Sequence, residues 1–96
     1  MLKVWGKIWY KHRVHQSYTA EDDHRNWSDE ARLEICIDEI IQVLDLPRPI
    51  WLKQNYDEMK KFGRTHFHQD HFIVQFPYQS FEVEIIGTDE DDEIES

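Results

Sequence analysis

The sequence has one cysteine, three glycines and three prolines among its 96 residues, and no apolar run long enough to span a membrane. A single thiol, Cys36, excludes an intramolecular disulfide and a cysteine-based metal site, which agrees with a reducing compartment. The three glycines (Gly6, Gly63 and Gly87) lie too far apart to form a phosphate-binding loop. The apolar stretch at 40–44 already contains a glutamine, whereas a membrane helix needs about 20 apolar residues.

Basic residues are also scarce. The chain has 11 Lys and Arg and 20 Asp and Glu, so its formal net charge is −9. Because nonspecific nucleic-acid affinity comes from Lys and Arg that displace counterions, nucleic acid is not an expected partner. The N-terminus has lysines among its apolar residues and lacks the pattern of a signal peptide, so we expect a cytoplasmic protein without membrane association. The length suits one hydrophobic core, which predicts a single domain at 1–88.

The first 20 residues alternate aromatic and β-branched side chains with polar ones. This pattern predicts two strands, roughly 2–10 and 13–20, joined by a turn at Lys11-His12. Gly6 is a candidate position for a β-bulge. If the first strand is regular, one face carries apolar residues and the other carries two indoles between lysines: Lys3, Trp5, Lys7, Trp9 and Lys11.

Two helices are predicted in the middle of the chain. Ser28, followed by two acids, is a good N-cap, and apolar residues then recur every three or four positions until Pro47 ends the helix. A second helix is expected from about Pro49 or Ile50 to Phe62, with Gly63 as its C-terminal stop. Its inner stripe is predicted to contain Leu52, Tyr56, Met59 and Phe62.

The last third of the chain is less regular. Residues 64–76 fit either a short strand followed by a turn or brief helix, or one continuous strand. Residues 81–85 alternate cleanly and predict a strand with Glu82 and Glu84 on a solvated face. The six acids of 89–96 predict a disordered acidic tail. The order β-β-α-α-(β)-β therefore predicts an α+β fold, with a small antiparallel sheet and two helices packed on one face.

The Trp5 and Trp9 face allows two interpretations. Tryptophan is enriched at interface hot spots, so Trp5, Trp9, Lys3 and Lys7 are candidates for binding a partner protein or for self-association, including a homodimer. In the alternative, the helices cover this face and the lysine stems pass beside the rings.

A cluster of potential metal ligands lies at 65–71 (THFHQDH). This segment is similar to the T-H-x-H-x-D-H signature of the metallo-β-lactamase fold, whose matching His and Asp residues bind one or two metals. That family needs further ligands far downstream, and no histidine follows position 71 here, so we treat the match as local and coincidental. A weaker alternative keeps His66, His68, Asp70 and His71 as ligands for zinc or another divalent metal. A turn between 68 and 70 is the conformation that could aim all four side chains at one ion. In the other conformations these side chains are solvated or hydrogen-bonded, and no cofactor is expected.

No catalytic constellation is apparent. Cys36 lies on the apolar stripe of the first predicted helix, where burial raises the pKa of a thiol and makes a nucleophile improbable. The chain resembles a family of small uncharacterised bacterial proteins of about 90 residues. The resemblance is carried by the run 2–9, the P-I-W-L at 49–52 and the acidic ending. The resemblance spans nearly the full length and implies a stand-alone domain without an assigned activity. The sequence thus predicts a non-enzymatic protein that binds a partner protein or itself, with a divalent-metal protein as the alternative.

Overall fold

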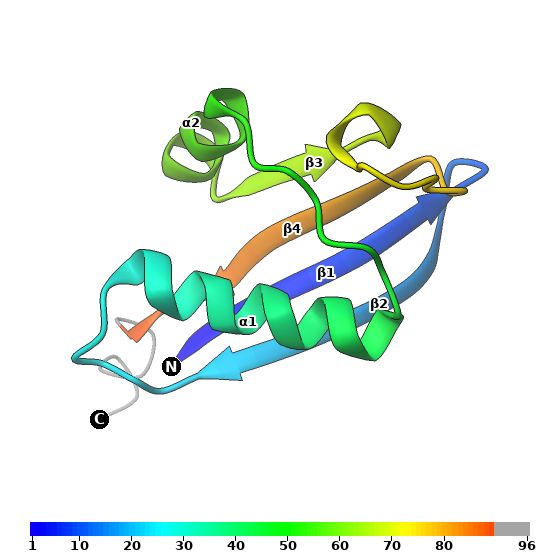
Figure 1. Ribbon diagram of the computed structural model, residues 1–96. Helices are drawn as coiled ribbons and strands as arrows, with labels where there is room; N and C mark the ends of the chain where they lie inside the picture. The colour runs from blue at the N-terminus through cyan, green and yellow to red at the C-terminus, as the bar shows by residue number, and fades with distance from the viewer. Residues whose placement is uncertain (90–96) are drawn as a thin grey trace.

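A computed structural model describes residues 1–89 of the chain. Its elements, in chain order, are β1 (Leu2–Tyr10), β2 (Arg13–Asp22), α1 (Asp29–Leu44), α2 (Lys53–Phe62), β3 (Arg64–Phe67), the short 3-10 helix η1 (Gln69–His71) and β4 (Ser80–Gly87). The strands form one antiparallel sheet in the order β2-β1-β4-β3. Both α-helices lie on the same side of this sheet, α1 across β1 and β2 and α2 beside β3 (Figure 1). The predicted α+β fold class is confirmed.

The β1–β2 hairpin closes through two residues with left-handed backbones. Lys11 has φ 52° and His12 has φ 64°, which is the geometry of a type I′ turn and matches the twist of paired strands. The turn is thus where the sequence predicted it, although neither residue is the Gly or Asn that this conformation favours. The register shifts lie between Ile8 and Trp9 against β2 and between Lys3 and Val4 against β4, so the bulge predicted at Gly6 is wrong.

Gly6 has a packing role instead. It faces α1, and a Cβ added there would lie 2.4 Å from Cγ2 of Ile40, which is fully buried. The glycine therefore lets α1 approach β1 closely. At its start α1 is capped as predicted, because the Ser28 hydroxyl accepts a hydrogen bond from the Ala31 N–H at 3.2 Å.

The second helix differs from the prediction in both its start and its buried face. It begins at Lys53, and the residues it buries are Asn55 and Met59. Of the predicted inner stripe, Leu52, Tyr56 and Phe62 are 47%, 52% and 63% exposed. Asn55 replaces them because its side chain has polar partners in the interior: it accepts from the Leu52 N–H and donates to Thr65 Oγ1 and to the His66 carbonyl.

The segment after β3 resolves the ambiguity at 64–76 in favour of a short strand followed by a brief helix, η1. The Gln69 side chain donates to the Val74 carbonyl at 3.2 Å and accepts from the Phe76 N–H at 2.7 Å. These bonds hold a loop in which Phe72 and Phe76 stack with ring centroids 4.3 Å apart. Residues 90–96 of the predicted acidic tail lie outside the described residues, whereas Asp89 lies within them.

One core lies between the sheet and the helices. It consists of Val4, Ile8, Ala20, Cys36, Ile37, Ile40, Leu46, Met59, Phe67, Phe72, Phe76, Phe81 and Val83. In the described part of the chain, no helix combines the length and apolar character needed to cross a membrane.

Candidate functional site

The sheet face opposite the helices is the strongest candidate site, because neither helix covers it (Figure 1). Side chains alternate along each strand, so β1 sends Val4 and Ile8 into the core and its indoles to the other side. Strand pairing places the neighbours of these indoles on the same side. We call this surface the open sheet face; it carries Lys3, Trp5, Lys7, Trp9, Val14, Ser17, Thr19, Glu21, Arg64, His66, Ser80, Glu82 and Glu84.

An ion pair occupies the centre of the open sheet face. Lys7 Nζ lies 3.3 Å from Glu82 Oε1 and 3.2 Å from Glu84 Oε1. The same ammonium lies 3.9 Å from the centroid of the Trp5 ring, which is a cation–π distance. Although neither α1 nor α2 lies above them, Lys7 and Glu82 are only 7% and 4% exposed. Neighbouring side chains therefore shield this pair from water.

Glu82 has two further partners. The Trp9 indole Nε1–H donates to Glu82 Oε1 at 2.8 Å, and His66 Nε2 lies 3.4 Å from the same oxygen. Burial raises the pKa of Glu82, but the bonds and charges from Trp9, His66 and Lys7 outweigh it, so the pKa is lowered overall. Glu82 therefore carries its charge at neutral pH and fixes the orientation of the Trp9 ring.

These positions correct two sequence interpretations. The helices do not cover the Trp5 and Trp9 face, so the interpretation in which they do is wrong. Glu82 is not a solvated carboxylate, because it is only 4% exposed and its cross-strand neighbour is Lys7. Of the candidate partner-binding residues, Lys3 is exposed, Trp5 and Trp9 are half-buried, and Lys7 is buried. The alternation along β1 could predict the shared face, but only the pairing of β1 with β4 brings Glu82 to Lys7.

The histidine cluster lies at the outer edge of the sheet, beside β3. We call this region the histidine groove; it is lined by Gln54, Asn55, Glu58, His66, His68, Asp70 and His71. The His66 and His68 rings are 6.4 Å apart and nearly parallel, while His71 is buried and its Nδ1 accepts from the His68 N–H at 3.0 Å. His66 Nε2 faces Glu82 instead. Within residues 1–89, no three His, Cys, Asp or Glu side chains form a group that could hold a metal ion.

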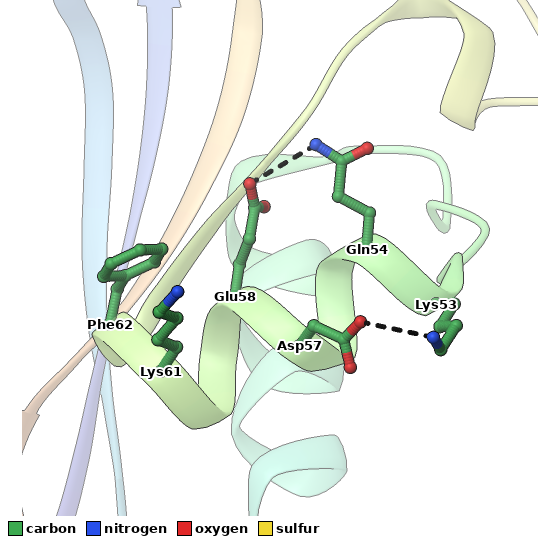
Figure 2. Close-up of a pocket in the computed structure, with 6 residues that line it drawn as sticks. All are labelled: Lys53, Gln54, Asp57, Glu58, Lys61 and Phe62. Atoms are coloured by element: carbon green, nitrogen blue, oxygen red, sulfur yellow. Dashed lines mark hydrogen bonds and ion pairs between the residues drawn. The ribbon is translucent and has the colours of Figure 1, made fainter.

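A second shallow depression lies on the solvent side of α2 (Figure 2). Its polar side chains pair along the helix: Lys53 Nζ lies 3.9 Å from Asp57 Oδ2, and Gln54 Nε2 donates to Glu58 Oε2 at 3.4 Å. Pairs at this spacing are ordinary on an exposed helix surface. The depression therefore offers no convergent chemistry.

A buried arginine that the sequence reasoning missed joins three parts of the chain. Arg32 is 5% exposed; its Nε donates to Asp22 Oδ2 and its Nη1 to Asp89 Oδ2, both at 2.7 Å. The bond from Arg32 is the main reason that the pKa of Asp89 is held far below its usual range. These contacts join β2, α1 and the segment after β4, so Arg32 is structural. Its position near the polar start of α1 gave no sequence signal.

The thiol of Cys36 is chemically inert in this fold. Cys36 is 1% exposed, and burial raises the pKa of its thiol to about 11. The thiol is therefore protonated at neutral pH and inaccessible, as its place on the apolar stripe predicted.

Comparison of the chain with protein-family models, with curated proteins and with solved structures found no match. The resemblance to a small bacterial family stays a prediction.

Proposed function

We propose that this protein is a non-enzymatic binding module that docks another protein on its open sheet face. The observation that carries the proposal is the pair of half-buried indoles, Trp5 and Trp9, fixed on a sheet face that neither helix covers. Each ring is held by a polar partner, so little side-chain entropy is lost when a partner covers it. The buried free thiol of Cys36 supports a cytoplasmic location.

The charges of the open sheet face indicate the chemistry of the partner. The chain has a net charge of −9, yet this face balances three cations (Lys3, Lys7 and Arg64) with three carboxylates (Glu21, Glu82 and Glu84). The central charges already pair with one another, so the indoles are the groups left for contact. A protein with a complementary apolar patch suits such a surface, whereas a polyanion does not.

Photo-crosslinking tests this proposal with two matched probes. A photoreactive phenylalanine analogue replaces Trp5 on the open sheet face or Tyr56, which is 52% exposed on the helical side. In a native cell extract, the probe at position 5 should capture a protein that the probe at position 56 does not. The captured protein is then purified and its affinity measured against Trp5→Ala and Tyr56→Ala.

We expect Trp5→Ala to weaken binding by about thirtyfold, the effect of losing a hot-spot tryptophan. Tyr56→Ala should leave the affinity unchanged, and added salt should have little effect because the face is neutral. Identical captures by both probes, no capture at all, or equal affinities of the two variants would refute the proposal.

A further inference from the structure

The histidine groove contains a slot with two flat walls. His66 belongs to β3 and His68 follows it on extended backbone, so the two side chains project to the same side of the chain. Their rings are stacked, with an interplanar angle of 16° and centroids 6.4 Å apart. Aromatic carbons in contact lie about 3.5–4.0 Å apart, so this wider gap has room for one planar group. Both side chains are exposed, and the slot therefore opens to solvent.

Carboxylates line the groove around this slot, whereas its lining contains no lysine or arginine. Glu58 accepts a hydrogen bond from the Thr65 hydroxyl at 2.6 Å. The Asp70 side chain is 82% exposed, and its Oδ1 lies 3.2 Å from His71 Nδ1. That nitrogen accepts from the His68 N–H, so it supplies no proton to Asp70. The groove thus attracts cations.

The cations of the neighbouring open sheet face do not change this sign. Lys7 stands opposite Glu82 and Arg64 stands opposite Glu84 in the strand register. Between them, His66 Nε2 lies 3.4 Å from Glu82 Oε1. Each positive charge beside the slot therefore has a carboxylate across from it, and the charges of the groove itself stay negative.

We propose that this slot binds the guanidinium group of an arginine side chain presented by a partner polypeptide. The group stacks between His66 and His68 and donates hydrogen bonds to the carboxylates of the groove. This inference does not rest on the docking proposed for the open sheet face, although His66 belongs to both surfaces.

A guanidinium matches the slot in shape and in charge. It is a planar cation that stacks on aromatic faces, and its edge carries five N–H donors. Midway between the rings it lies about 3.2 Å from each centroid, half of the 6.4 Å separation, and the exposed rings need to part by only a few tenths of an ångström for optimal contact. Its donors point in several directions, whereas a metal ion needs ligands that converge, as those of residues 1–89 do not.

Other ligands of similar size suit the slot less well. The ammonium of lysine is compact and strongly hydrated, so it cannot stack on two rings. A nucleobase is planar, but its phosphates would approach the carboxylates of the groove in a chain of net charge −9. The α-carboxylate of free arginine would likewise find no cation in the lining. An arginine within a polypeptide has no such carboxylate.

Titration of the full chain with blocked amino acids, followed by NMR of the backbone amides at about pH 8, tests the ligand. Nα-acetyl-arginine methylamide should bind with a dissociation constant of about 1–5 mM and shift the amides of residues 64–71. The lysine derivative has the charge without the plane, and the citrulline derivative has the plane without the charge. Both should bind about tenfold more weakly. Free arginine and the phenylalanine derivative should bind about threefold more weakly or less.

Substitutions in the groove test the residues. His68→Ala removes one wall and should weaken binding of the arginine derivative by about tenfold, whereas His68→Phe keeps a flat wall and should stay within about threefold of the wild type. His15→Ala is the matched control, because His15 is exposed outside the groove. Asp70→Asn should weaken binding by about three- to fivefold. Asp57→Asn makes the same charge change on the solvent side of α2 and should have no effect.

The variants at position 68 should keep the fold, because the hydrogen bond to His71 comes from the backbone N–H; thermal melts check this. Loss of binding in His68→Ala that His68→Phe restores would support the slot. Lysine or citrulline derivatives that bind as well as the arginine derivative would overturn the proposal. So would free arginine or the phenylalanine derivative binding as tightly, an absence of shifts at 64–71, or an unchanged affinity of His68→Ala.

Discussion

The buried ion pair on the open sheet face leads to the most informative stability prediction. Lys7→Met removes the ammonium and leaves Glu82, 4% exposed, without its closest cation. Breaking a buried pair in this way costs about 3–5 kcal/mol. Because Glu82 keeps its bonds to Trp9 and His66, we expect the low end, about 3 kcal/mol. In a domain of this size the loss corresponds to about 12–24 °C in Tm.

A double-mutant cycle separates the interaction energy of the Lys7–Glu82 pair from the effect of each single substitution. Lys7→Met/Glu82→Leu removes both charges, and apolar replacement of a buried pair is often close to neutral, so we expect the double variant to lie within about 1 kcal/mol of the wild type. Lys3→Met is the matched control, since Lys3 is an exposed lysine of the same strand and face; its cost should stay below about 0.5 kcal/mol. Urea denaturation followed by circular dichroism measures five proteins: the wild type, the single variants Lys7→Met and Glu82→Leu, the double variant and the Lys3→Met control. If Lys7→Met cost no more than Lys3→Met, the pair would behave as a solvated surface pair and the reasoning would be refuted.

The same pair predicts the direction of acid sensitivity. The pKa of Glu82 is lowered in the folded protein because the bonds and charges from Trp9, His66 and Lys7 outweigh its burial. Its contribution to stability is therefore complete above the unfolded-state pKa of about 4.3 and is lost as the pH falls toward the lower folded value. Stability of the wild type should decline below about pH 5, and the double variant should decline less over the same interval.

Three further outcomes follow. Arg32→Met leaves the carboxylate of Asp22 buried without its guanidinium and should cost about 3–5 kcal/mol in urea titrations; a loss below about 1 kcal/mol would contradict the buried network. Gly6→Ala places a methyl group against Ile40 and should cost about 1–3 kcal/mol; in an Ile40→Ala background, adding Gly6→Ala should cost less, and an equal penalty in both backgrounds would argue against the contact. Calorimetry with zinc should show only weak binding, because the ligands of the histidine groove do not converge; stoichiometric sub-micromolar binding, abolished by His68→Ala, would show that a metal site forms there.

The candidate site illustrates which signals a sequence carries. The lysine and indole alternation of β1 predicted that Trp5 and Trp9 share a face, because a strand has a fixed period of two. The sequence could not predict that Glu82, 75 residues beyond Lys7, completes the cluster, since strand order depends on how the elements pack. The phase of α2 was predicted wrongly for a related reason. Asn55 displaces apolar residues from the interior because Thr65 and the His66 carbonyl supply partners that are visible only in the fold.

The amino-acid sequence by itself determined the local elements of this protein: the hairpin, the capped first helix and the α+β class. Hydrophobic periodicity and capping act over a few neighbouring residues, so they can be recognised without the fold. The tertiary structure alone decided which sheet face the helices cover, which edge stays unpaired and which charges meet. These features arise from contacts between residues far apart in the chain, and burial makes the energies of such contacts depend on the whole arrangement.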